Sequence, residues 1–222
     1  QLGHNLDLVE QEIDRLNAIV VDFLFAVRPM DIILMRDRAE EVVREVAEFM
    51  KDEIEQQHIT LRLEIAENLP EVMLDRKYLK QALLNIVKNA IAAMPDGGTL
   101  TISITSANDE LLLSVTDTGI GIPEELQPKI FEPYFTTKET GTGLGLTITF
   151  KIVKEHNGEI TVTSKPGKGS TFTIHIPVPQ PERKSLPPGE EHSTTATSVH
   201  AGAGMTEAEL QEVAREAQRT EA

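Results

Sequence analysis

Two adjoining segments with alternating apolar residues constrain the fold of this chain more than any other feature. The segments "TLTISITSA" (99–107) and "ELLLSVTDT" (110–118) place apolar side chains at every second position, which is the period of a half-buried strand. Asn108 and Asp109 between them are typical of a tight hairpin turn. The sequence therefore predicts an antiparallel strand pair here.

Helix and strand patterns continue on both sides of this pair. Residues 75–94 predict a strong helix, with apolar residues at core spacing from Leu79 to Val87 and Pro95 at its end. In chain order, the expected elements are an extended piece (32–35), a helix (38–57), a strand (58–66), a brief strand within 69–75, the helix 75–94, the hairpin, a helix from about 144 to 156 and a second hairpin (159–178). This order predicts an α+β fold, a two-layer α/β sandwich in which helices cover one face of a mixed sheet.

A heptad pattern precedes this domain and predicts a long coiled-coil-like helix. Its apolar positions alternate in steps of four and three: Leu2, Leu6, Val9, Ile13, Leu16, Val20, Phe23 and Val27. Self-association through residues 2–27 would cover this stripe; an amphipathic helix packed on its own domain is the alternative. Pro29 ends the helix. We therefore expect a dimerisation helix over 1–29 and a globular domain over 30–178.

The composition changes after residue 178 to Pro, Glu, Ser, Thr and Gly. Residues 179–222 are therefore expected to form a flexible tail. Within it, Thr206 and Glu209 form a capping box at the start of a possible short helix over 206–218.

Composition also excludes several classes of protein. The 222 residues carry a formal net charge of −15, which argues against an electrostatic nucleic-acid binder. Cysteine is absent, which excludes disulfides and thiolate metal sites. No apolar run approaches the length of a membrane span and no signal peptide opens the chain, so we expect a cytoplasmic protein.

The stretch "TTKETGTGLGL" (136–146) suggests a phosphate-binding loop. Its glycines alternate as G-x-G-x-G, which matches neither the Walker loop nor the dinucleotide fingerprint. Lys138 in this stretch would meet a terminal phosphate as a point charge. A flexible loop that ends at a helix N-cap is the plain alternative.

Two amide side chains lie four residues apart on the predicted helix 75–94. Asn85 and Asn89 share one face of that helix. Their oxygens suit a hard cation such as Mg²⁺, which keeps waters and substrate phosphates among its ligands. Two surface asparagines without a ligand are the alternative, although asparagine is a mediocre helix former.

A carboxylate ends the first hairpin, in "DTGIGIP" (117–123). Asp117 there can accept a hydrogen bond from an exocyclic amine such as that of adenine. Gly119 and Gly121 would let the backbone approach a flat ring closely. An ordinary turn is an equally good interpretation of the motif taken alone.

Three aromatic residues lie in the polar loop that follows, in "IFEPYFTTK" (130–138). We interpret Phe131, Tyr134 and Phe135 as the apolar anchor of a mobile lid. A small satellite core under a long loop is the alternative.

Together these stretches resemble the catalytic domain of sensor histidine kinases, within the ATPase group that includes gyrase and the mismatch-repair ATPases. In chain order, "LLNIVKNAIAAM" is similar to the N box of that family, "DTGIGIP" to its G1 box, "IFEPYFTTK" to its F box, "GTGLGL" to its G2 box and "GKGSTFTIHIP" to its closing strand. The resemblance covers about residues 5–177, and the subclass resembles the nitrogen-regulation type.

The resemblance implies an ATP-binding kinase domain that uses Mg²⁺. It implies that Asn89 is the main magnesium ligand, that Asn85 and Lys88 lie near the phosphates and that Asp117 reads the adenine amine. It also implies catalytic roles for Asn85 and Lys138. The full set of expected nucleotide contacts is Asn85, Lys88, Asn89, Asp117, Gly119, Gly121, Ile122, Phe131, Lys138, Thr142, Gly143, Leu144, Gly145 and Leu146.

One position distinguishes the chemistries of this group. Gyrase-like relatives carry a glutamate base four residues before the magnesium asparagine, where this chain has Asn85. An amide takes no proton at neutral pH, so ATP hydrolysis is disfavoured and a histidine imidazole is the expected nucleophile.

None of the six histidines has the family's phosphoacceptor context. The acceptor helix is therefore expected to lie outside this chain, which would bind ATP without phosphorylating itself. The expected partners are ATP, a response regulator and that acceptor helix. The alternatives are a nucleotide-gated protein-interaction switch and, less favoured, an ATP hydrolase.

Overall fold

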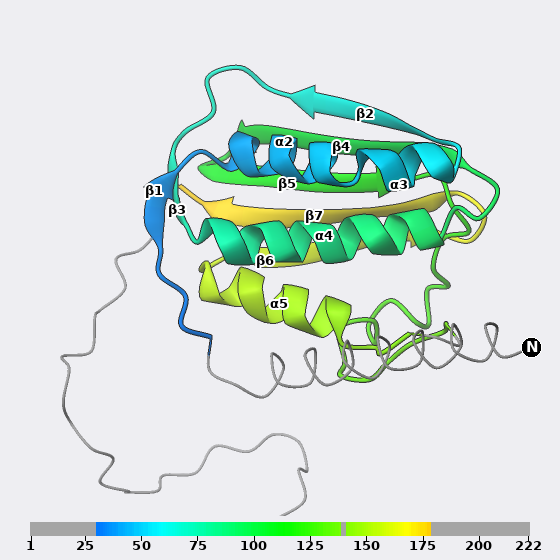
Figure 1. Ribbon diagram of the computed structural model, residues 1–222. Coiled ribbons are helices and arrows are strands. Elements are labelled where there is room, and N and C mark those ends of the chain that lie inside the picture. Colours follow the sequence, from blue (N-terminus) through cyan, green and yellow to red (C-terminus); the bar gives the residue numbers. More distant parts are fainter. Residues whose placement is uncertain (1–29, 139–140, 179–222) are drawn as a thin grey trace, which may run out of the picture. The chain divides into compact units, whose positions relative to one another are not determined.

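The computed structural model describes residues 30–138 and 141–178. They form a two-layer α+β domain around a five-stranded sheet (Figure 1). The strand order is β2 (Ile59–Ile65), β4 (Gly98–Ala107), β5 (Glu110–Asp117), β7 (Gly169–Pro177) and β6 (Glu159–Lys165). The β2–β4 pair is parallel and the other three pairs are antiparallel.

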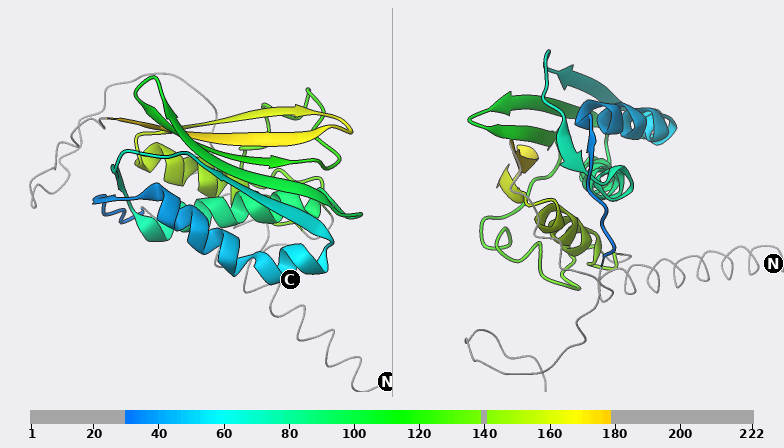
Figure 2. Two further views of the ribbon diagram at one scale, coloured as in Figure 1. Left: turned by 90° about the horizontal axis from the view of Figure 1, so that it is seen from above. Right: turned by 90° about the vertical axis from the view of Figure 1, so that its left-hand side faces the viewer.

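Helices cover one face of this sheet, as the two views of Figure 2 show. They are α2 (Ala39–Phe49), α3 (Lys51–Gln56), α4 (Arg76–Ala92) and α5 (Gly145–Glu155). Alternate residues of β4 and β5 are buried beneath them, including Ile102, Ile104, Leu113 and Val115. The predicted α+β sandwich with a mixed sheet is confirmed, whereas the predicted helix over 1–29 and the tail over 179–222 lie outside the described residues.

The hairpin between β4 and β5 has the predicted tight turn. Ala107 pairs with Glu110, and Asn108 and Asp109 between them have φ angles of 53° and 60°. Asparagine and aspartate tolerate this left-handed conformation better than most residues, and it matches the twist of the flanking strands. The register of the hairpin places Asp117, the last residue of β5, opposite Leu100 of β4.

Two details near the N-terminal side of the domain differ from the prediction. The extended piece lies at β1 (Met35–Asp37) rather than 32–35, and it pairs with β3 (Val72–Leu74) in a separate small sheet. The single helix expected over 38–57 is divided into α2 and α3 at Met50, where ψ is 0°. Main-chain hydrogen bonds from Met50 to Val46 and from Ile54 to Met50 carry the chain across this division.

Candidate functional site

Asp117, the last residue of β5, is the most buried of the predicted site residues that can ionise. Its exposed fraction is 3%, and its Oδ1 accepts a hydrogen bond of 2.8 Å from the Gly119 N–H. Burial raises the pKa of Asp117, while the N–H groups of Gly119 and Ser170 act in the opposite direction. A buried carboxylate at the end of a strand is therefore held by its own following loop.

The loop after Asp117 packs against the C-terminal end of α4. The Ile120 N–H donates to the Ala93 carbonyl over 3.0 Å, and a Cβ on Gly119 would overlap that same carbonyl. Gly121 has φ +70°, and a Cβ there would overlap the Lys165 carbonyl. Both glycines thus have a reason in the protein's own packing, in addition to the predicted approach of a flat ring.

Asn85 joins α4 to the first turn of α5. Its Nδ2 donates to the Gly145 carbonyl over 3.0 Å and to Thr149 Oγ1 over 3.4 Å. Thr149 is fully buried and donates its own hydroxyl to the Gly145 carbonyl over 2.9 Å. A carboxylate at position 85 has no N–H for these bonds, so the amide has a structural task here as well as the predicted one.

Asn89 lies one turn further along α4 and contacts the loop that follows β5. Its Oδ1 accepts a hydrogen bond of 2.9 Å from the Lys138 ammonium. Partial burial of that ammonium lowers the pKa of Lys138. The oxygen predicted to bind a cation thus accepts a hydrogen bond from an ammonium group in this structure. Lys88, between the two asparagines, is exposed.

These contacts align along one row of α4. Asn85, Asn89 and Ala93 are spaced four residues apart, so they follow one another on the same face of the helix. They contact Gly145, Lys138 and the Asp117 loop respectively. Over eight residues the helix rises about 12 Å. The structure therefore brings the predicted magnesium, phosphate and base-reading residues to one side of α4, beside the start of α5 (Figure 1).

The glycine-rich stretch leads directly into α5, which begins at Gly145. Gly143 has φ +69°, and a Cβ there would overlap the main chain of Tyr134. Thr142 Oγ1 accepts a hydrogen bond of 3.3 Å from the Leu144 N–H. The Leu144 side chain is buried beside Ile148, and Leu146 packs against the main core. Any contact of Leu144 with a ligand would therefore come from its main chain.

The aromatic residues of the 130–138 stretch do not all act as the predicted anchor. Phe131 and Phe135 pack against the main core, and the Phe131 ring lies 5.8 Å from the Phe150 ring. Tyr134 is instead 60% exposed, so its predicted anchoring role is wrong. Its φ of 63° lies in the left-handed region, and its main chain packs against Gly143. Ile122 is half-buried, and its N–H donates to Ser164 Oγ over 2.7 Å.

A buried histidine links the two helices that carry the site, and the sequence interpretation missed this link. The Asp75 N–H, at the N-cap of α4, donates to His156 Nε2 over 2.9 Å. His156 Nδ1 lies 2.7 Å from the Ile152 carbonyl of α5. The ring is 1% exposed. The sequence predicted that this helix ends at about residue 156, but the partner of His156, 81 residues away, leaves no local pattern.

Comparisons with known proteins agree with this geometry. Residues 74–180 match the model of the family described as "Histidine kinase-, DNA gyrase B-, and HSP90-like ATPase". The match spans α4, the Asp117 loop and α5. These residues form a domain of that family. It is the type of domain that the related sensor histidine kinases carry.

Three similar proteins show how far the relationship extends. Sporulation kinase E of Bacillus subtilis (strain 168) is 35% identical over 78% of this chain and 24% of its own length. Full-length ShkA in complex with AMPPNP has a TM-score of 0.71 at 26% identity, over 78% of this chain and 38% of that one. Histidine kinase ThkA in complex with response regulator protein TrrA has a TM-score of 0.68 at 32% identity, over 80% of this chain and 51% of that one.

This chain therefore spans about a quarter of that curated relative and between about a third and a half of those two solved chains. Within the described residues, every helix is too short or too polar to cross a membrane.

Proposed function

We propose that this domain binds ATP with Mg²⁺ along the α4 row and transfers the γ-phosphoryl group to a histidine on a helix outside this chain. The observation that carries the proposal is the row itself, where Asn85, Asn89 and Ala93 bring Gly145, Lys138 and the Asp117 loop to one helix face. The AMPPNP complex of ShkA supports a nucleotide ligand.

The residues present fit both ligands. Asp117 offers a buried carboxylate to an exocyclic amine, and the first turn of α5 offers main-chain N–H groups to phosphate oxygens. The Asn89 and Asn85 amide oxygens are hard ligands suited to Mg²⁺, which neutralises charge on the phosphates when bound. Lys138 adds a cation that can leave Asn89 and pair with a terminal phosphate.

The chain's own residues favour transfer over hydrolysis. Asn85 offers no carboxylate to deprotonate water, and its Nδ2 is occupied with Gly145 and Thr149. In the proposed transfer, an imidazole nitrogen attacks the γ-phosphorus, an N–P bond forms, the P–O bond to the β-phosphate breaks and ADP leaves. Asn85 would position the phosphates, Lys138 would neutralise part of their charge, and Phe131 fixes the loop to the core.

The finer features of the proposal concern the whole protein. We propose a nitrogen-regulation-like subclass, a homodimer through residues 2–27, cytoplasmic location and a response regulator as the partner that receives the phosphoryl group. The complex of ThkA with TrrA supports that partner class. Of the three described histidines, His58 lies in the turn before β2, His156 is buried between two helices and His175 contacts Glu110 at 3.1 Å. None of the three has the acceptor motif of the family, so we expect no autophosphorylation.

Titration calorimetry followed by a transfer assay tests the proposal. Mg-ATP should bind the full chain, and radiolabel should pass from γ-labelled ATP to a supplied helical hairpin that carries the acceptor histidine. A hairpin with that histidine changed to alanine is the control. ATP binding without transfer would favour the switch instead, and steady phosphate release without the hairpin would favour a hydrolase. No binding heat would contradict all three.

A further inference from the structure

Strand β2 forms one edge of the five-stranded sheet, and it pairs with β4 on one side only (Figure 1). No other strand among residues 30–138 and 141–178 pairs with its outer side. The Ala66 N–H donates to the Ile104 carbonyl of β4. Because main-chain groups alternate in direction along a strand, those of Leu61, Leu63 and Ile65 point away from the sheet. The edge therefore presents free donors and acceptors.

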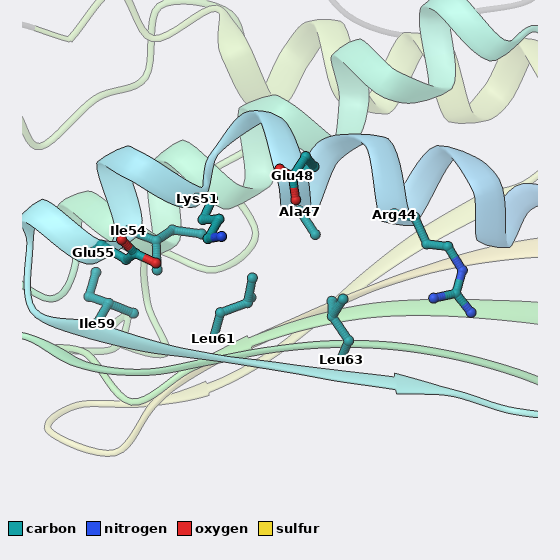
Figure 3. A pocket seen from close by; sticks show the side chains of 9 residues that line it. All are labelled: Arg44, Ala47, Glu48, Lys51, Ile54, Glu55, Ile59, Leu61 and Leu63. Carbon is teal, nitrogen blue, oxygen red and sulfur yellow. The ribbon is translucent and has the colours of Figure 1, made fainter.

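The helix-facing side of this edge is apolar and incompletely covered. Leu63 is 41% exposed, and a cavity of about 500 Å³ lies between β2 and the pair α2–α3. Figure 3 shows Leu61 and Leu63 pointing from β2 toward Ala47 and Ile54 on the helices. Apolar surface exposed beside an unpaired strand is a site where another strand can add.

The opposite side of the same strand carries two charges of opposite sign. Arg62 and Glu64 are exposed, and neither forms an ion pair with another described residue. Leu63 is therefore the centre of the segment "LRLEI" (61–65): it has one charged residue of each sign beside it, and one apolar residue stands at each end.

We propose that β2 pairs antiparallel with β2 of a second copy of this chain, about a two-fold axis at Leu63. In this register Leu63 opposes Leu63 of the second copy and Leu61 opposes its Ile65, so the outward main-chain groups of these three residues are paired. Arg62 of each copy opposes Glu64 of the other on the outer face. Opposed charges of opposite sign stabilise a strand pair, and like charges destabilise it.

The charges select this register over its neighbours. A shift that moves the two-fold axis to residue 62 places Arg62 opposite Arg62 of the second copy, and a shift to residue 64 places Glu64 opposite Glu64. Registers between these place main-chain groups that point into the sheet of one copy opposite groups that point outward from the other. They also bring the apolar face of one strand to the charged face of the other. The axis at Leu63 thus gives apolar pairs on the helix side and ion pairs on the outer side.

The pairing is independent of the proposed ATP site, because β2 contributes no residue to the α4 row. The net charge of −15 repels two copies at long range. The association is therefore expected at high protein concentration and to strengthen when salt screens that repulsion, while its short-range pairs set the register.

Disulfide trapping tests the pairing, since the chain has no cysteine. In the full chain, Leu63→Cys places the two sulfurs on an opposed pair whose Cα atoms lie about 5.5 Å apart, within the span of about 4.4–6.8 Å that a disulfide bridges. Under mild oxidation this variant should form covalent dimers. The matched control is Glu159→Cys, exposed on the other edge strand, β6, which should stay uncrosslinked.

An exchange of charges then tests the register. In the Leu63→Cys variant, the additional change Arg62→Glu should slow crosslinking about tenfold. It places a glutamate at position 62 of each copy opposite Glu64 of the other. The further change Glu64→Arg should restore the parent rate by reversing each ion pair. The circular dichroism spectrum and the ATP affinity of each variant should match those of the parent. Crosslinking no faster than in the Glu159→Cys control would overturn the pairing. Equal crosslinking rates with and without the charge changes, or a slower rate that Glu64→Arg does not restore, would overturn the register.

Discussion

The two ends of the α4 row are built in different ways. At the proposed base-reading end, Asp117 is 3% exposed at the end of a central strand, and its loop is hydrogen-bonded to the Ala93 carbonyl. At the proposed phosphate end, the loop residue Lys138 contacts α4 through a side-chain hydrogen bond from its ammonium to Asn89. The position of the first end is thus determined by the register of the sheet, whereas the second end depends on a side chain that can exchange partners. We expect the first end to govern which base binds and the second to govern the metal-dependent part of binding.

The largest effect is expected at the base-reading end. Asp117→Asn should lower ATP affinity about a hundredfold, since a hydrogen bond to a charged group contributes about 1.5–3 kcal/mol. The amide can turn its own donor toward the adenine amine, so preference for ATP over GTP should fall as well. Competition titrations measure both. Asp96→Asn, at an exposed aspartate, is the control; unchanged base preference in Asp117→Asn would refute the assignment.

A smaller effect is expected at the phosphate end. Asn89→Ala removes the oxygen that contacts Lys138 and should cost about tenfold in ATP affinity with Mg²⁺ present. With the metal chelated, the variant and the parent should bind nearly alike. Gln81→Ala, two turns earlier on α4, serves as the control. An Asn89→Ala variant that keeps the full magnesium dependence of the parent would exclude the residue as a ligand.

The glycine stretch should respond more weakly than either end. Gly143→Ala adds a Cβ that overlaps the Tyr134 main chain at φ +69°, so the loop must move and ATP affinity should fall by about threefold to tenfold. Gly167→Ala has a similar φ of +70° but open space around it. It should cost about 1 kcal/mol in the free energy of unfolding and leave affinity unchanged. Equal affinities in the two variants would show that the steric contact is unimportant.

The smallest effect is expected on the stability of the fold, and it should vary with pH because of Asp117. Burial raises the pKa of Asp117 in the folded state, so the folded protein holds its proton more tightly than the unfolded chain. Stability from this group is present at acid pH and is lost as pH rises through the folded pKa. Asp117→Asn should therefore melt at a higher temperature than the parent at pH 7, and the difference should shrink toward about pH 4. A difference that is constant with pH would contradict this origin.

Much of the fold and of the site could be predicted from local patterns. The hairpin about Asn108 and Asp109 follows from alternation and turn chemistry, both of which are local properties of the chain. The spacing of Asn85 and Asn89 likewise places them on one helix face without any knowledge of their neighbours. The motifs in their order indicated the family, and the match of residues 74–180 agrees.

Other features had no local signal. The exposure of Tyr134 depends on how its loop passes Gly143, so the presence of an aromatic residue in a polar loop could not predict it. The division of the first helix at Met50 leaves the apolar period of 39–54 unchanged, which is why the pattern predicted one helix. The bond from Asp75 to His156 joins residues 81 positions apart.

Local patterns in the amino-acid sequence are enough to predict most helices and strands, the chemical types of the candidate site residues and the family, because each depends on the identity and spacing of nearby residues. The structure was needed to show that one row of α4 contacts all three parts of the candidate site, that Asn85 donates to α5 and that the edge of β2 stays unpaired among the described strands. These features depend on contacts between segments far apart in the chain, and the directions of those contacts are set when the helices pack on the sheet.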